Sequence, residues 1–217
     1  MQPPALDRPA LTRQRILDAA LDLADAEGLD ALSMRRLGAV LGVEAMSLYH
    51  HVPSKAALLD GLVALVLSRV PLPEVSGGAW EDLIRTGLIE FRRLMLRHRS
   101  IFPLVGSRPV ADPAALRPVA RAFAVLHAAG FAPRQAVSAW CTLLSYTFGY
   151  IECEVSGIAQ ANRGESILQA VREQEGGDYG SLRLSHETAS EWDDDEEYER
   201  GLRTVIVGLR TELARGD

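Results

Sequence analysis

Helix start and stop signals are the feature that most constrains the fold of this 217-residue chain. Thr12, Ser33 and Ser54 are residue types that cap helix N-termini, and each precedes a segment with apolar residues at every third or fourth position. A glycine follows the first two segments, and a proline-containing stretch follows the third, as is usual where helices end. The alternation of apolar and polar residues that marks a half-buried strand is almost absent. We therefore expect an all-α chain.

The same signals divide the chain into expected helices and two connecting stretches. The expected helices cover residues 12–28, 33–42, 43–51, 54–69, 80–99, 100–105, 112–130, 133–155 and 195–214. Residues 71–78 are rich in proline and glycine, and residues 156–190 are rich in Gly, Ser, Gln and charge without a sustained period, which we interpret as an excursion between helices. We expect a small N-terminal domain at residues 1–53, a connecting helix at 54–70 and a larger C-terminal domain at 71–217.

The composition is that of a globular protein. Apolar residues make up 47% and charged residues 24%, which is enough for a packed core. No run approaches the roughly 20 apolar residues of a membrane-spanning helix, and no secretory signal is visible, so we expect a cytoplasmic protein. Cys141 and Cys153 fall in one expected helix about 18 Å apart, too far for a disulfide, and we interpret them as reduced core thiols.

The net charge of −6 argues, taken alone, against a nucleic-acid partner, because phosphate contacts need a basic surface. However, eight of the 29 acidic residues lie between Glu187 and Glu199, in a run without Lys or Arg. Outside this run, 23 basic residues face 21 acidic ones. We interpret the run as a solvated segment before the last helix, where acidic side chains also suit the helix dipole. The net charge therefore says little about the partner.

Residues 33–55 have the pattern of a helix-turn-helix. Two short expected helices meet at Leu41-Gly42-Val43, and a turn containing glycine is typical of this motif. The positions expected to be buried against the first helix of the chain are Leu37, Leu41, Val43, Leu48 and Val52. The second short helix then exposes Glu44, Ala45, Met46, Ser47, Tyr49, His50 and His51. Because so short a helix contributes little to a core, its exposed aromatic ring and two imidazoles indicate a binding surface.

The segment from residue 12 to about 69 resembles the DNA-binding domain of the TetR family of transcriptional repressors. The resemblance is carried by the LGV turn at 41–43, LYHH at 48–51, Lys55 and ALLD at 57–60. It implies that the second short helix enters the major groove, while the N-terminus of the preceding helix meets the DNA backbone. The implied contacts are Ser33, Met34 and Arg35 on the preceding helix, Ala45, Met46 and Ser47 in the groove, and Tyr49, His50, His51 and Lys55 on the phosphate side.

The implied groove-facing residues limit how bases can be recognised. Ala45 and Met46 have no polar side-chain atoms, so they can offer thymine methyl contacts or shape, but not paired hydrogen bonds. Direct recognition of sequence then rests on Arg35 and Ser47, with DNA shape supplying the remainder. Lys55, the only lysine among the 23 basic residues, stands where the family places a phosphate contact.

Residues 80–155 resemble, more loosely, the regulatory domain of the TetR subgroup nearest the tetracycline repressor. In that subgroup a small-molecule effector lies between these helices, and its binding moves the connecting helix. The positions that hold the drug and magnesium there correspond here to Pro71, Leu104, Gly87 and Cys153. These side chains do not supply the oxygen ligands that magnesium prefers, so we expect no metal and no cofactor.

The residues that remain at the implied effector site predict a largely apolar effector. They are Phe91, Leu104, Pro109, Val137, Trp140 and Leu144. Core packing is the alternative explanation for each of them taken singly.

The resemblance also implies a homodimer, in which residues 133–155 and 195–214 of each copy form a four-helix bundle. A two-fold dimer predicts a palindromic operator on double-stranded DNA. We therefore expect a one-component transcriptional regulator, a repressor that a small-molecule effector releases from its operator. The alternatives are an activator and an architectural DNA-binding protein without a ligand. We expect no enzymatic activity, because the sequence has neither a phosphate-binding glycine loop nor a GxSxG nucleophile motif.

Overall fold

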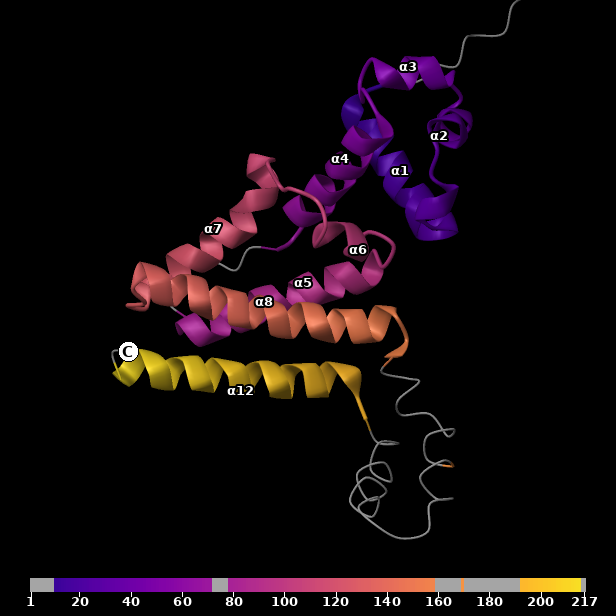
Figure 1. Cartoon of the computed structure of the whole chain (residues 1–217). Coiled ribbons are helices and arrows are strands. Elements are labelled where there is room, and N and C mark those ends of the chain that lie inside the picture. Colours follow the sequence, from indigo (N-terminus) through magenta and orange to yellow (C-terminus); the bar gives the residue numbers. More distant parts are fainter. Residues whose placement is uncertain (1–9, 72–77, 159–168, 170–191, 216–217) are drawn as a thin grey trace, which may run out of the picture. The chain divides into compact units, whose positions relative to one another are not determined.

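The computed structural model describes residues 10–71, 78–158, 169 and 192–215, and over these residues it is helical without a strand (Figure 1). The all-α prediction is confirmed. The α-helices are α1 Arg13–Glu27, α2 Met34–Leu41, α3 Ala45–Tyr49, α4 Lys55–Ser68, α5 Trp80–Arg97, α6 Phe102–Val105, α7 Pro113–Ala128, α8 Pro133–Val155 and α12 Asp194–Arg215. The predicted excursion at 156–190 lies, apart from residues 156–158 and 169, outside the described residues.

The three predicted N-terminal caps are confirmed by their hydrogen bonds. The hydroxyl oxygens of Thr12 and Ser33 each accept from a backbone N–H three residues later at 3.2 Å, and that of Ser54 accepts at 3.0 Å. Gly42 ends α2 in the left-handed conformation, with φ of 70°, which glycine adopts without steric cost. Local sequence signals therefore set the ends of the short helices.

The described residues form two compact units. The first contains the chain up to Arg69 together with Arg97–Arg117, and the second contains Val70–Leu96 and the chain from Pro118 onward. Within the first unit, two polar pairs attach residues 97–117 to the N-terminal helices. His98 Nδ1 lies 2.6 Å from Asp25 Oδ2 on α1, and Arg108 Nη1 lies 2.5 Å from Asp60 Oδ1 on α4. This insertion therefore packs with α1 and α4.

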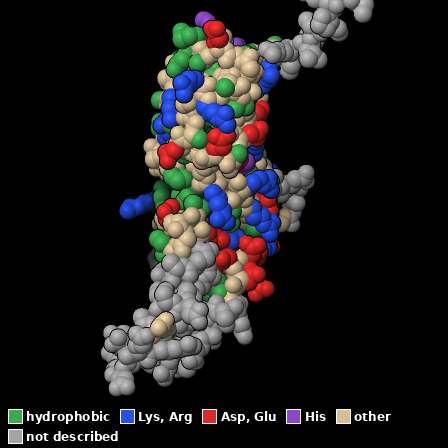
Figure 2. Space-filling view, turned by 90° about the vertical axis from the view of Figure 1, so that its right-hand side faces the viewer, with side chains coloured by type: hydrophobic (Ala, Val, Ile, Leu, Met, Phe, Trp, Pro, Cys, Tyr) green, Lys and Arg blue, Asp and Glu red, His purple; other side chains and the backbone are tan. Residues whose placement is uncertain are grey.

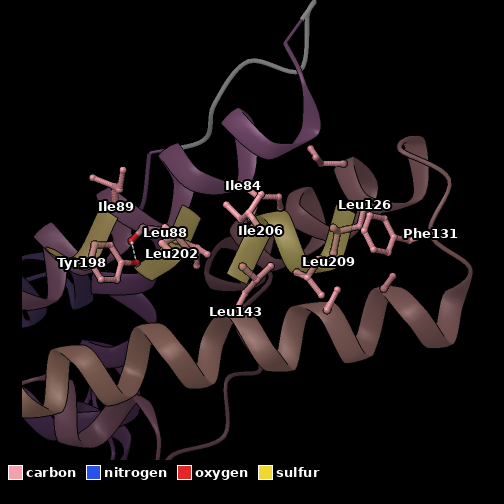
Figure 3. Packing of buried hydrophobic residues seen from close by; sticks show 13 residues of the cluster. Ile84, Leu88, Ile89, Leu126, Phe131, Leu143, Tyr198, Leu202, Ile206 and Leu209 are labelled. Atoms are coloured by element: carbon pink, nitrogen blue, oxygen red, sulfur yellow. Dashed lines mark hydrogen bonds between the residues drawn. The ribbon is translucent and has the colours of Figure 1, made fainter. Parts of the chain in front are cut away.

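The core of the second unit is built from α5, α7, α8 and α12 (Figure 3). Its buried side chains are Ile84, Leu88, Ile89, Val125, Leu126, Phe131, Ala136, Ala139, Leu143, Tyr198, Leu202, Ile206 and Leu209. Tyr198 is fully buried and donates its hydroxyl proton to the Leu88 carbonyl at 3.3 Å. Burial raises the pKa of Tyr198, so the phenol stays protonated and keeps this donor role.

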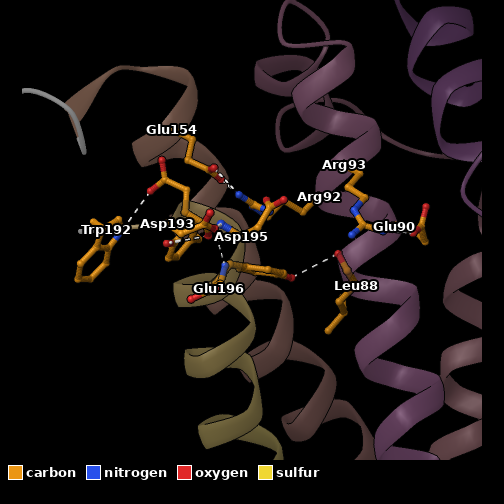
Figure 4. Close-up of polar contacts among 12 residues, drawn as sticks. Leu88, Glu90, Arg92, Arg93, Glu154, Trp192, Asp193, Asp195 and Glu196 are labelled. Carbon is orange, nitrogen blue, oxygen red and sulfur yellow. Dashed lines mark hydrogen bonds and ion pairs between the residues drawn. The ribbon is translucent and has the colours of Figure 1, made fainter. Parts of the chain in front are cut away.

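A buried cation connects three helices of the second unit (Figure 4). Arg92 on α5 is 2% exposed. It donates two hydrogen bonds to Glu154 on α8, at 2.5 and 2.8 Å, and one to Asp195 on α12, at 2.5 Å. Burial lowers the pKa of Arg92, but its hydrogen bonds to Glu154 and Asp195 outweigh burial and raise that pKa above its usual value. The guanidinium also lies 4.9 Å from the ring centroid of Tyr198, within cation–π range.

One sequence interpretation needs correction, and a second needs an addition. Cys141 is exposed on α8 and Cys153 is half-buried, so Cys141 is not a core thiol. The described acidic side chains of the run are exposed or half-exposed, as interpreted, but Asp195, 66% exposed, also binds the buried Arg92. The Asp195 contact depends on which helix lies opposite, since Arg92 is 103 residues away in the sequence. No helix among the described residues combines the length and the apolar character needed to span a bilayer.

We predict that Arg92→Met lowers the free energy of unfolding by about 3 kcal/mol, because it leaves the Glu154 carboxylate buried without its cation. Arg93→Met is the matched control on the same helix, since Arg93 is half-exposed and its ion pair, within the described residues, is with Glu90 one turn away. Urea unfolding at one protein concentration measures both variants. Equal losses for the two variants would contradict the role given to Arg92.

Candidate nucleic-acid interface and effector-site residues

The turn between α2 and α3 is closed by backbone contacts at Gly38. The Val43 N–H donates to the Gly38 carbonyl at 2.9 Å. A Cβ at position 38 would lie 2.8 Å from the Val43 oxygen and 3.2 Å from the Ala45 nitrogen. The start of α3 therefore packs directly on the backbone of α2, and only glycine leaves room for it.

Buried leucine and valine side chains pack on the core side of this turn. Leu37 and Leu48 are fully buried, and Val52 is 1% exposed, as predicted. Leu41 and Val43 are half-buried, because they lie at the edge of the turn. Leu48 is the one residue of α3 that is fully buried, and Met46 and Tyr49 are the two that are exposed.

The predicted groove and phosphate residues lie on this outward side. Met46 is 69% exposed and Tyr49 is 40% exposed, while Ala45 and Ser47 are half-buried. The remaining predicted contacts that are exposed are Ser33, Arg35, His50, His51 and Lys55. Figure 2 shows histidine and hydrophobic side chains gathered at the end of the first unit that carries α3. The structure therefore brings apolar, imidazole and cationic groups together on one accessible surface.

Met34 differs from the other predicted contacts. Its side chain, at the first position of α2, is 7% exposed and belongs to the core, so it does not lie on the outward surface with the others. The apolar character of methionine and its place beside the cap residue Ser33 are consistent with this inward position.

The two arginines at the start of α2 have different partners. Arg36 binds Glu27 of α1 at 2.5 Å, and the hydrogen bond to Glu27 raises the pKa of Arg36. Arg35 is exposed, and no ion pair joins it to another residue in the described part of the chain. Arg35 is therefore the arginine of this helix that is available to an external anion or base.

The predicted effector-site residues are divided between the two units. Leu104 and Pro109 belong to the first unit, where Leu104 is half-buried and Pro109 is exposed. Phe91, Val137, Trp140 and Leu144 belong to the second unit. The six positions are therefore not one cluster of a single unit.

Aromatic pairs connect the second-unit members to residues that the sequence prediction omitted. Phe91 stacks on Phe148 with centroids 5.7 Å apart, and Trp140 lies 6.1 Å from Phe123 of α7. Phe148 follows Leu144 by one helical turn, a spacing from which it could have been included. Phe123 carries no such signal, because its proximity to Trp140 depends on how α7 packs on α8.

A separate cavity of about 370 Å³ lies between α8 and α12. Its lining residues are Phe131, Arg134, Gln135, Ser138, Ala139, Leu209, Glu212 and Leu213. None of the predicted effector-site residues contributes to it. Within the described residues, no group of three or more His, Cys, Asp or Glu side chains is placed to hold a metal ion.

We predict that Gly38→Ala lowers the free energy of unfolding by about 2 kcal/mol, because the new methyl group meets the Val43 carbonyl oxygen rather than a movable side chain. Gly87→Ala is the control, since a Cβ there has no neighbour within 4 Å and alanine favours the interior of α5, which should add about 0.5–1 kcal/mol. Urea unfolding and amide hydrogen exchange over α2 and α3 measure the difference. A Gly38→Ala protein as stable as the parent would contradict the close contact.

Two family models match this chain. Residues 16–62 match the family model of bacterial regulatory proteins of the tetR family, and residues 72–213 match the model of the tetracyclin repressor-like C-terminal domain. An HTH-type transcriptional regulator of Saccharopolyspora erythraea is 33% identical over 204 residues, which are 93% of this chain and 86% of the relative. The tetracycline repressor protein class A from transposon 1721 of Escherichia coli is 30% identical over 198 residues, or 89% and 88% of the two chains.

A solved structure matches over nearly its whole length. The crystal structure of the TetR family protein ActR of Streptomyces coelicolor in complex with actinorhodin has a TM-score of 0.83 and 28% identity. The match covers 94% of this chain and 97% of that one.

Proposed function

This chain belongs to the tetR family of bacterial regulatory proteins, and we propose that it is a one-component repressor that binds a palindromic operator as a homodimer and leaves it when a small molecule binds. It would act in the cytoplasm, where the proposed operator DNA is located. An activator with the same two binding functions, and an architectural protein without a ligand, are the alternatives that the experiments below separate.

The outward face of α3 is the observation that carries the proposal. A helix-turn-helix protein inserts its second helix into the major groove, with the first residues of that helix on the base edges. In α3, Leu48 is buried, while Met46 and Tyr49 are exposed, so the helix has no evident role in the core beyond a single anchor. An exposed methionine and tyrosine on so short a helix are explained by a partner surface.

Cationic side chains next to α3 support binding to phosphates. Lys55 is exposed at the first position of α4, and Arg35 is exposed in the first turn of α2. Contacts of this kind position a protein on DNA and release counterions, which makes the affinity fall with salt. Direct base recognition would then come from α3.

The surface of α8 supports the homodimer. From residue 135 to residue 151 the sequence has no charged side chain, yet Ser138, Cys141, Thr142 and Ser145 are exposed. The neighbouring helix α12 exposes Val207, at 45%, with Thr204 and Thr211 near it. A solvated helix face is ordinarily rich in charge, so the uncharged exposed face of α8, with Val207 exposed on the neighbouring helix, fits a two-fold interface with a second copy.

Aromatic side chains in the second unit support a largely apolar effector. The pairs Phe91–Phe148 and Trp140–Phe123 offer ring faces and edges, and Val137 is 51% exposed nearby on α8. Planar apolar molecules bind well to such surfaces. The similar protein ActR has been crystallised with actinorhodin, which makes ring-containing compounds the first to test.

We predict that Tyr49→Ala and Lys55→Ala each abolish retention of operator DNA in a gel shift while the dimer stays intact by size-exclusion chromatography. The operator is first selected from random-sequence DNA or found by footprinting the region upstream of the protein's own gene. Lys55→Gln should also reduce the slope of log affinity against log salt by about two per dimer, one for each lost phosphate contact. Arg97→Ala, which removes an exposed cation elsewhere, is the control. Unchanged retention for both Tyr49→Ala and Lys55→Ala would refute the interface.

We predict that an effector at 100 times its Kd raises the melting temperature by about 5 °C and reduces operator retention. Trp140→Ala should remove both responses, because it deletes the ring that pairs with Phe123. Trp192→Ala, an exposed tryptophan outside that group, should keep them. If aromatic compounds bind without changing operator retention, the architectural alternative is favoured; if they activate transcription through a retained complex, the activator is favoured.

A further inference from the structure

The base-recognition chemistry of α3 is unusually poor in hydrogen-bonding groups. Of the three residues at its N-terminal end, Ala45, Met46 and Ser47, only the serine carries a polar side-chain atom, and it is half-buried. The major groove distinguishes base pairs by donors, by acceptors and by the 5-methyl group of thymine. Two of these three positions can therefore sense only the methyl group or the shape of the groove.

Met46 is placed to sense the methyl group. Its 69% exposure is the highest of any large hydrophobic residue in the described part of the chain. It is the second residue of α3, in the turn that helix-turn-helix proteins direct at base edges. An unbranched thioether is flexible and polarisable, so it can follow the position of a methyl group on the groove floor.

The polar side chains near Met46 are not placed or suited to recognise a thymine at the same position. Arg36 is held by Glu27, and Arg35 projects from α2 rather than from α3. His50 and His51 follow the last residue of α3, away from its N-terminal turn. The exposed Glu44 can accept a hydrogen bond from cytosine, but it cannot recognise thymine.

We propose that Met46 is a specificity-determining residue that recognises a thymine in each operator half-site by packing its side chain against the 5-methyl group. The proposal rests on the proposed function, since it presupposes that α3 enters the major groove. It specifies how one base of each half-site is recognised, namely by an apolar contact with the methyl group and not by a hydrogen bond.

Replacing thymine by deoxyuridine tests this contact, because the exchange removes the methyl group and keeps every hydrogen bond of the base pair. Each thymine of the selected operator is replaced in turn, and affinity is measured by fluorescence anisotropy. For the parent protein we expect one position per half-site at which the exchange lowers affinity about fourfold. Changing both half-sites should lower affinity about fifteenfold, because each half-site then loses the burial of one methyl group.

Variants at position 46 separate a direct contact from DNA shape. Met46→Ala should bind more weakly and become indifferent to deoxyuridine at that position, whereas Met46→Leu should stay sensitive to it. Val40→Ala removes another exposed apolar side chain, on α2, and should retain the full sensitivity of the parent. Because Met46 is mostly exposed, its replacement leaves the core intact.

The outcomes distinguish this inference from the proposed function. An operator-binding protein without a methyl-sensitive position, or one whose sensitivity is the same in Met46→Ala, would overturn the inference and leave DNA binding standing. A parent protein that selects no DNA at all would overturn the proposed function, and the Met46 contact with it.

Discussion

The contact of α3 with the backbone of α2 is the constraint on which the candidate interface depends. Helices of eight and five residues are not stable alone in water, so α2 and α3 exist only because they pack on each other and on α1. Gly38 permits the close approach, and Leu37 and Leu48 fill the space beneath it. The exposed side chains owe their positions to these few contacts, because α3 has almost no stabilising interactions of its own.

In the second unit, a buried ionic contact connects helices that are distant in the sequence. Arg92 joins the middle of its own helix to the end of α8 and the start of α12, with partners 62 and 103 residues away. Its two carboxylates and the Tyr198 ring compensate for the desolvation that burial imposes. The helices proposed to form the dimer are thus held in register at one end by an ionic contact, and along their length by the apolar core.

Local signals were sufficient for the helices and for the burial of Leu37, Leu48 and Val52 beneath the turn, but not for contacts between distant segments. The caps at Thr12, Ser33 and Ser54 act on backbone groups three residues away, so their effect is visible in the sequence. The inward position of Met34, the role of Arg92 and the pairing of Trp140 with Phe123 are not, because each depends on which helix lies opposite. The family resemblance supplied positions for an effector site, but it could not supply their aromatic neighbours.

The single buried anchor of α3 has a consequence for how this protein can change. Leu48 is the one buried side chain of α3, and Met46 is 69% exposed, so position 46 can be exchanged with little effect on the folding free energy. Under the proposed function, the base preference set by position 46 is then nearly independent of the stability of the chain. A gene duplicate could acquire a new target by substitution at this position without compensating mutations elsewhere, and the same separation makes position 46 a suitable starting point for redesign.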